Sequence, residues 1–191
     1  MFKDLVLRSR SYRSFDSTFP VPRQLLLDWI DCARLCPSSI NLQVLKFRLV
    51  TSQKECDILL SGTRWAGKLK DITLPPVEHA PTAYIVICAD RSVHAAAESF
   101  QKDVGICAQT VLLAATEAGF GGCMIGSFSP EGLQTDLKLP KDLVPQLVIA
   151  LGKPDEEVAL SPLPENGDTS YFREGGVHFV PKRALEDIVI E

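Results

Sequence analysis

The sequence predicts a single domain that combines α-helices with a β-sheet, and three features of the 191-residue chain support this prediction. Residues 84–89 are all apolar over the length of a strand, which is typical of a strand buried on both faces. Residues 22–36 carry apolar side chains at helical spacing, and residues 92–118 are the longest helical stretch. A chain of this length buries roughly 70% of the surface of its unfolded form, which is enough for one core.

The first part of the chain is predicted to contain short helices and one strand. Residues 1–8 form a helix with Phe2, Leu5 and Val6 on one side. A second helix opens after Pro20 and Pro22, runs to about Cys36 and ends at Pro37, because proline cannot continue a helix. The next elements are, in order, a polar loop (37–43), a strand (47–50), a helix (53–60) and an irregular segment (61–81).

The second part is predicted to contain a central helix and two core strands. Residues 105–118 are apolar on nearly every side, so this helix is expected to be buried and to lie at a subunit interface. Gly119 suits the left-handed cap that ends it, and Ser129 with Pro130 predicts the start of a short helix to Leu137. The further predictions are strands at 123–125 and 146–151 and a mostly irregular segment over 155–191, whose apolar end (188–190) needs a surface such as a partner subunit.

Composition and charge exclude several classes of protein. The net charge of -4 argues against nucleic acid and anionic membranes as partners, because both attract basic surfaces. The sequence has no run of 18 apolar residues, and residues 1–10 lack the features of a signal peptide, so we expect a cytoplasmic protein. The six cysteines are expected to be reduced thiols, and the three histidines show no metal-ligand spacing.

Basic residues near both ends of the chain are candidates for binding a phosphate group. Residues 8–13 contain three arginines and two serines, and arginine gives charged bidentate hydrogen bonds to phosphate while serine gives neutral ones. The alternative is a solvated basic helix end, which the helix dipole favours. Lys182 and Arg183 either complete such a phosphate site or solvate the tail.

Two other segments are suited to a flat polar ligand. Asn41 and Gln43, in the loop at 37–43, each carry a donor and an acceptor on a planar amide, which suits the uracil-like edge of a flavin; the alternative is a simple loop after a helix. Gly126, at the end of a strand, permits close approach of a ligand to the backbone. The glycines at 119–126 do not form a dinucleotide fingerprint, because Met124 stands at the third glycine position and the helix precedes the strand.

Taken together, the order and spacing of these segments resemble the FMN-dependent nitroreductase family. Residues 9–15 (S-R-S-Y-R-S-F) resemble its R-R-S-x-R-x-F motif, and residues 36–43 (C-P-S-S-I-N-L-Q) resemble A-P-S-S-x-N-x-Q-P. Residues 103–128 resemble its central helix and a strand ending in I-G-x-F, and residues 148–154 resemble a strand ending in L-G-x-P. Residues 181–186 (P-K-R-A-L-E) resemble the closing K-R-x-P-L-E.

The resemblance implies an α+β fold, with a mixed sheet flanked by helices, in one domain spanning residues 1–191. It also implies an obligate homodimer with two FMN sites at the interface, in which the C-terminal tail is exchanged and adds a strand to the partner's sheet. Arg10 and Ser11 would hold the phosphate and ribityl chain, with Lys182 or Arg183 completing the charge, and Arg13 would lie near the pyrimidine edge. The full set of implied cofactor-binding residues is Arg10, Ser11, Arg13, Pro37, Ser38, Ser39, Asn41, Gln43, Ile125, Gly126, Ser127, Lys182 and Arg183.

In this set, Ser38, Ser39 and Asn41 would come from the other subunit, and the backbone of Gly126 and Ser127 would face flavin N5. Lys68 or Lys70 is the candidate for a lysine that approaches the flavin. The segment 90–103 is short where larger members insert helices, which predicts an open or differently shaped substrate pocket.

The implied activity is hydride transfer from NAD(P)H through flavin N5 to an electron-poor acceptor such as a nitroaromatic or quinone, in a ping-pong scheme without a protein nucleophile. Three alternatives stay open. They are another flavin reaction on the same fold (reductive dehalogenation or flavin fragmentation), a non-enzymatic flavin-binding protein, and a structural dimer that has lost its flavin.

Overall fold

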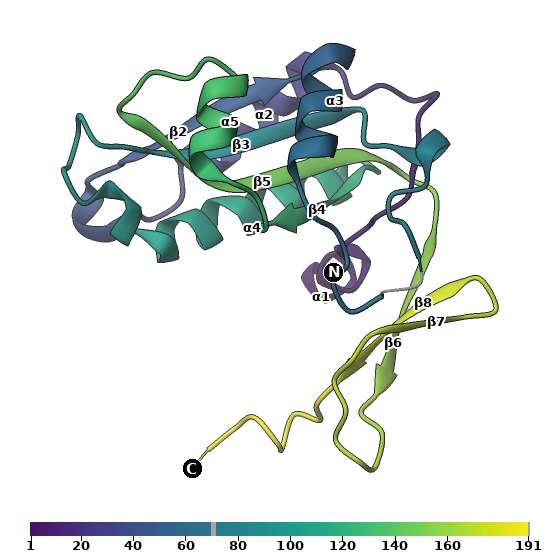
Figure 1. Cartoon of the computed structure of the whole chain (residues 1–191). Coiled ribbons are helices and arrows are strands. Elements are labelled where there is room, and N and C mark those ends of the chain that lie inside the picture. The colour runs from purple at the N-terminus through teal and green to yellow at the C-terminus, as the bar shows by residue number, and fades with distance from the viewer. Residues whose placement is uncertain (70–71, 191) are drawn as a thin grey trace.

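The computed structural model describes residues 1–69 and 72–190, and its main feature is a five-stranded sheet (Figure 1). The strands are β1 (Phe15–Asp16), β2 (Leu45–Val50), β3 (Ala83–Asp90), β4 (Gly121–Ile125) and β5 (Leu143–Pro154). Their order is β1-β5-β3-β2, and β4 also pairs with β5. All four strand pairings in this sheet are antiparallel.

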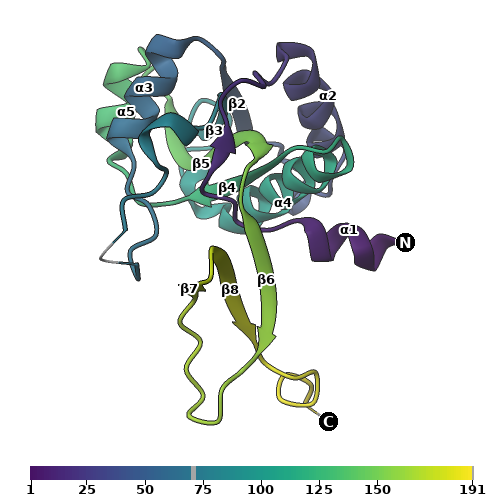
Figure 2. The same cartoon turned by 90° about the vertical axis from the view of Figure 1, so that its right-hand side faces the viewer.

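Two pairs of helices cover the two faces of this sheet (Figure 2). The helices α2 (Arg23–Arg34) and α4 (Gln101–Glu117) pack on one face, and α3 (Gln53–Gly62) and α5 (Pro130–Asp136) on the other. Side chains of β3 alternate between these faces, with Ile85 and Ile87 toward α2 and α4, and Tyr84 and Val86 toward α3 and α5. Every residue of β3 is buried, as the apolar run predicts, and the α+β class is confirmed.

The expected helix at 92–118 begins later than predicted, at Gln101. The carboxylate of Asp90 accepts hydrogen bonds from the backbone N of Ser92 at 2.9 Å and from its hydroxyl, which forms a turn directly after β3. A short 3-10 helix, Ala97–Ser99, then precedes α4. Gly119 ends α4 with a φ of 78°, and the Ser129 side chain caps α5, as predicted.

Residues 155–190 are mostly irregular, as predicted, but the prediction missed three strands in this segment. Strands β6 (Glu157–Pro162), β7 (Phe172–Glu174) and β8 (Val177–Lys182) form a second sheet that projects from the body of the molecule (Figures 1 and 2). Gly175 and Gly176, both at positive φ, make the two-residue turn between β7 and β8. The pairing of β6 with β8 is parallel, so the expected mixture of parallel and antiparallel strands lies in this sheet rather than in the main one.

Two glycines of β4 allow the N-terminal segment to cross the sheet. This segment follows the short helix α1 (Phe2–Arg8), and Tyr12 donates its backbone N–H to the carbonyl of Gly122 at 3.0 Å. A Cβ atom on Gly121 would lie 2.6 Å from the Tyr12 ring, and one on Gly122 would lie 2.2 Å from the Ala150 carbonyl oxygen. The Gly121 approach and the hydrogen bond to Gly122 place Tyr12 beside the start of β4, and the missing side chain of Gly122 lets β5 pair closely with β4.

All six cysteines are free thiols, as predicted. Burial raises the pKa of the Cys107 thiol to about 11, so this cysteine is protonated at neutral pH. None of the helices in residues 1–69 and 72–190 is long and apolar enough to cross a membrane.

Candidate cofactor-binding site

Segments near both ends of the chain meet at one cavity, which we call the Arg10 cavity. Its volume is about 420 Å³, within the usual range for small-molecule sites. It lies where the N-terminal segment, α4, β4 and the small sheet come together. Its lining residues are Ser9, Arg10, Ser11, Arg13, Gln109, Leu112, Met124, Tyr171, His178, Val180 and Lys182. The structure therefore brings Lys182 to the predicted phosphate cluster.

The Arg10 cavity is strongly cationic although the chain carries a net charge of -4. Arg10, Arg13 and Lys182 line it, whereas none of its lining residues is acidic. Within the described part of the chain, none of these three cations belongs to an ion pair. Arg10 donates to the Val6 carbonyl at 2.6 Å, while its Nε atom is buried without a partner in the described residues. These groups are arranged to receive an anion.

Within the described residues, the guanidinium of Arg13 makes only neutral contacts. It donates to the Ser11 carbonyl at 3.1 Å and lies 3.3 Å from Nε2 of His178. The same guanidinium lies 5.0 Å from the centre of the Tyr171 ring, which is cation–π distance. Among the described residues no carboxylate forms an ion pair with this guanidinium, so its positive charge is available to a ligand in the cavity.

A buried carboxylate attaches the small sheet to the N-terminal segment. Glu156, whose side chain is 5% exposed, forms an ion pair with Arg173 of β7. The same carboxylate accepts hydrogen bonds from the backbone N of Arg13 and, at 3.1 Å, from that of Ser14. Glu156 thereby fixes the position of Arg13 relative to Tyr171 and His178.

His178 is the only histidine that lines the Arg10 cavity in the described chain, and it is 1% exposed. Burial, together with the positive charges of Arg13 and Arg173, lowers its pKa to about 4. The imidazole is therefore neutral at pH 7.

The depressed pKa of His178 predicts that the folded protein loses stability in mild acid. The unfolded chain binds a proton at this histidine below about pH 6.5, whereas the folded chain binds it only near pH 4. Between pH 7 and pH 5 the free energy of unfolding is expected to fall by about 2 kcal/mol from this group. Denaturant titrations at the two pH values measure it. His94→Asn, at an exposed histidine, should show the same fall in the free energy of unfolding between pH 7 and pH 5 as wild type. If His178→Asn also showed the full fall, His178 would not be its cause.

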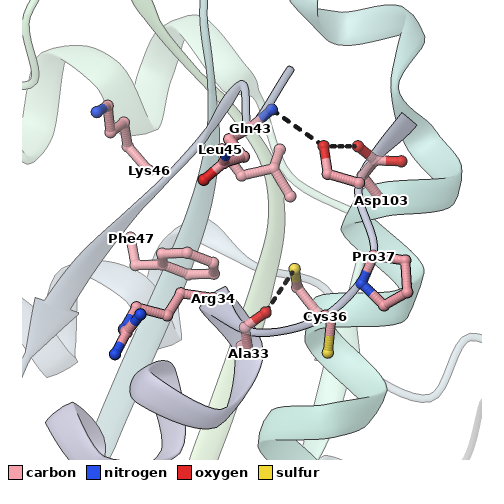
Figure 3. Close-up of a pocket in the computed structure, with 11 residues that line it drawn as sticks. Ala33, Arg34, Cys36, Pro37, Gln43, Leu45, Lys46, Phe47 and Asp103 are labelled. Atoms are coloured by element: carbon pink, nitrogen blue, oxygen red, sulfur yellow. Dashed lines mark hydrogen bonds between the residues drawn. The ribbon is translucent and has the colours of Figure 1, made fainter. Parts of the chain in front are cut away.

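Part of the second predicted cluster lines a smaller cavity of about 200 Å³ between α2, β2 and α4 (Figure 3). Pro37, Ser38 and Gln43 lie in its wall, and we call it the Gln43 cavity. Ser38 donates its hydroxyl to the Asp103 carboxylate at 2.9 Å and accepts from the backbone N of Gln43 at 3.0 Å. Ser39 donates to Asp103 from its hydroxyl at 2.7 Å and from its backbone N. Both serine hydroxyls therefore hold the loop to α4 in this structure.

The loop that carries Asn41 has an unusual backbone. Ile40, Asn41 and Gln43 have φ angles of 48°, 55° and 52°, in the left-handed region that a β-branched residue such as Ile40 rarely adopts. The Ile40 side chain is 88% exposed at the tip of the loop. Strained, exposed backbone of this kind is typical of binding segments.

The two cavities lie on opposite sides of α4. Asp103 and Cys107 of this helix line the Gln43 cavity, whereas Gln109 and Leu112 line the Arg10 cavity. Leu112 follows Asp103 by nine residues, or two and a half turns, which places it on the opposite side and about 13 Å along the axis. One chain therefore does not bring the two clusters of predicted residues together.

The remaining predicted residues are distributed around the end of β4 and the tail. Ile125 lies in the core between the sheet and α5, whereas Gly126 and Ser127 are exposed, and Ser127 accepts a hydrogen bond from the backbone N of Arg64 at 2.9 Å. Arg183 is exposed beyond Lys182 and does not line the Arg10 cavity.

Of the two lysines predicted to approach the flavin, the structure describes Lys68 only. Lys68 donates to the Ser170 hydroxyl at 3.2 Å, next to Tyr171 of the cavity wall. Lys70 lies outside the described residues.

Sequence reasoning missed several lining residues, chiefly Tyr171 and His178 on the small sheet, together with the carboxylates Asp103 and Glu156 that hold the cavity walls. The glycine pair at 175–176, with strand-forming residues such as Val177 and Phe179 after it, was the available signal for the β7–β8 hairpin. No local pattern marks the two carboxylates, because their partners are distant in sequence.

Comparisons with known proteins identify the family of this chain. A family model described as "Nitroreductase family" matches residues 6–153. A curated relative from Methanothermobacter thermautotrophicus, described as "Putative NADH dehydrogenase/NAD(P)H nitroreductase", is 27% identical over 151 residues, covering 77% of this chain and 74% of the relative.

Solved structures show the same fold. An FMN-dependent nitroreductase from Clostridium difficile R20291 is 27% identical with a TM-score of 0.63, covering 80% of this chain and 87% of that protein. A nitroreductase family protein from Clostridium novyi NT is 25% identical with a TM-score of 0.65, covering 81% and 86% of the two chains. Since the family model spans well over half of the sequence, this chain belongs to the nitroreductase family.

Proposed function

We propose that this chain is an FMN-dependent oxidoreductase that passes hydride from NAD(P)H to an electron-poor acceptor, such as a nitroaromatic or a quinone, in a ping-pong scheme. The observation that carries the proposal is the Arg10 cavity. Three cations line it that have no ion-pair partner in residues 1–69 and 72–190, and none of its lining residues is acidic. The names of the relatives support the nicotinamide and flavin components. When bound, FMN supplies the redox chemistry by accepting and releasing hydride at N5.

The residues of the cavity fit a mononucleotide. Arg10 and Lys182 provide charge for the phosphate group, and Arg10 has a buried Nε atom without a partner in the described residues. Ser11 adds a hydroxyl for the phosphate or the ribityl chain. A Cβ atom on Gly126 would meet nothing within 4 Å, so the backbone at the end of β4 is open to a flat ring.

Arg13 has an electrostatic role in this proposal. With FMN bound, it would place a positive charge at the pyrimidine edge and would stabilise an anionic ring there. The contacts of Arg13 with Ser11, Tyr171 and His178 hold this charge in place before reduction occurs.

A second copy of the chain is part of the proposal. The loop carrying Ser38, Ser39 and Asn41 lies on the far side of α4 from the Arg10 cavity, so the loop of a partner subunit would complete each site. Exposed apolar side chains suit such an interface, and they lie on the loop, on α4 and on the tail: Ile40, Ile106, Leu185, Ile188, Val189 and Ile190. The tail would add a strand to the partner's sheet.

Simple measurements on the purified protein distinguish the proposed function from its alternatives. A yellow purified protein with flavin absorption bands excludes a structural dimer that has lost its flavin. Oxidation of NADH with a nitroaromatic or quinone separates the enzyme from a non-enzymatic flavin-binding protein. Reductive dehalogenation and flavin fragmentation keep the same cavity and differ in their products.

Replacing Arg10 with alanine tests the phosphate assignment. We expect Arg10→Ala to weaken FMN binding at least about tenfold, because a charged hydrogen bond to phosphate contributes about 1.5–3 kcal/mol. Binding is measured by quenching of FMN fluorescence, with riboflavin as the ligand that lacks phosphate. Arg8→Ala is the matched control, because Arg8 is exposed and does not line the cavity. Wild-type FMN affinity in Arg10→Ala would refute the assignment.

A further inference from the structure

One buried donor in the wall of the Arg10 cavity has no acceptor within the described residues. His178 of β8 lines this cavity and is 1% exposed. Its Nε2 atom lies 3.3 Å from the Arg13 guanidinium, while its Nδ1 atom is buried without a hydrogen-bond partner. Buried polar side-chain atoms in native proteins nearly always have a partner, so the exception calls for an explanation.

The contact with Arg13 determines which nitrogen carries the proton. A guanidinium can only donate hydrogen bonds, so Nε2 of His178 must accept. The proton of the neutral ring therefore resides on Nδ1, and the unpartnered atom is an N–H donor. Leaving such a donor buried and unpaired is unfavourable, and an oxygen of a bound molecule would pair it.

We infer that His178 is a ligand-binding residue of the Arg10 cavity, whose Nδ1–H donates to an acceptor oxygen in the riboflavin portion of the bound FMN. This inference rests on the proposed function. The riboflavin portion is favoured because His178 contacts Arg13, which we place at the pyrimidine edge, whereas Arg10 and Lys182 supply the charge for the phosphate. A neutral donor suits a carbonyl or hydroxyl oxygen, and the nearby Arg13 already supplies the positive charge.

The residue belongs to a part of the chain that the family model does not include. The match ends at residue 153, whereas His178 and the neighbouring Tyr171, with ring centres 5.3 Å apart, lie on the small sheet. Glu156 attaches that sheet to the N-terminal segment, so the chain itself supplies this wall of the cavity. His178 would thus add a contact to the flavin that residues 6–153 do not provide.

Binding of FMN and riboflavin to three variants tests the inference. The amide of asparagine places a donor near the position of Nδ1, that of glutamine places one near Nε2, and leucine has neither. We expect His178→Leu and His178→Gln to weaken the binding of FMN and of riboflavin by the same factor, about tenfold. The affinities of His178→Asn for both ligands should stay within about threefold of those of wild type. Arg10→Ala should weaken the binding of FMN and leave the binding of riboflavin unchanged. If the His178 variants lost affinity for FMN but not for riboflavin, His178 would lie at the phosphate. If their affinities for both ligands were unchanged, His178 would not belong to the site. Either result overturns the inference.

A measurement on the unmodified protein avoids any effect of the variants on folding. The chain has three histidines, so ¹⁵N–¹H spectra of the imidazoles resolve His178 once His178→Asn identifies its signals. We expect an Nδ1-protonated ring whose proton signal moves downfield when riboflavin is added. A ring protonated at Nε2, or an Nδ1 proton that riboflavin leaves unmoved, would overturn the inference while FMN binding by wild type leaves the proposed function intact. If the wild-type protein binds neither FMN nor riboflavin, the proposed function fails and the inference fails with it.

Discussion

Glu156→Ala is expected to lower the free energy of unfolding by about 3–5 kcal/mol, the range observed when one partner of a buried ion pair is removed. The substitution leaves Arg173 without its carboxylate and leaves the backbone N–H groups of Arg13 and Ser14 without an acceptor. For a chain of this length the midpoint of thermal unfolding should fall by roughly 10 °C. Because the small sheet would separate from the N-terminal segment, FMN affinity should fall as well.

Two variants make this result specific. Glu157→Ala removes an exposed carboxylate at the next position and should change the unfolding free energy by less than about 0.5 kcal/mol. Glu156→Gln keeps an acceptor for the backbone N–H groups of Arg13 and Ser14. Its free energy of unfolding should therefore lie between those of Glu156→Ala and Glu157→Ala. If Glu156→Ala unfolded at the same temperature as Glu157→Ala, Glu156 would not be the residue that attaches the small sheet to the N-terminal segment.

Asp103→Ala is expected to lower the free energy of unfolding by about 3 kcal/mol at pH 7. Asp103 is 3% exposed and accepts hydrogen bonds from the Ser38 hydroxyl and from the hydroxyl and backbone N of Ser39. Hydrogen bonds to a charged group contribute about 1.5–3 kcal/mol each before relaxation, and the carboxylate also lies in the first turn of α4, where the helix dipole favours it. Denaturant titration measures the loss.

The pH dependence identifies the carboxylate as the cause. Burial raises the pKa of Asp103, but the hydrogen bonds from Ser39 and Ser38 outweigh it, so the pKa lies below its ordinary value. The stabilisation is therefore present above about pH 4 and is lost as the pH falls through the lowered pKa. Lys102→Ala, at the exposed neighbouring position, is the matched control. Equal stability of Asp103→Ala and Lys102→Ala at pH 7 would rule out this role.

In the proposed site, the two carboxylates would hold ligand-binding groups in position without binding FMN themselves. Glu156 sets the position of Arg13 in the Arg10 cavity, and Asp103 holds the loop that carries Asn41. In the proposed dimer these are the two walls of one site, one from each subunit. Loss of Asp103 should therefore reduce FMN affinity only through the partner's loop.

By itself the sequence predicted most of the helices, the core strands and a candidate set of phosphate-binding residues. These features depend on local patterns: the apolar run of β3, the proline that ends α2, and a cluster of arginine and serine before the first strand. Each such pattern reflects interactions between neighbours in sequence, such as helical spacing or a cap, so one segment is sufficient to recognise it.

Only the tertiary structure decided the small sheet, the two carboxylates and the environment of His178. The strands β6 and β8 pair across a long connection, and Glu156 and Asp103 bond to residues far away along the chain. The burial that makes His178 neutral and leaves its Nδ1 unpaired arises when β8 packs against the N-terminal segment. Contacts of this kind depend on which surfaces meet in the folded chain, and no local pattern of residues encodes that.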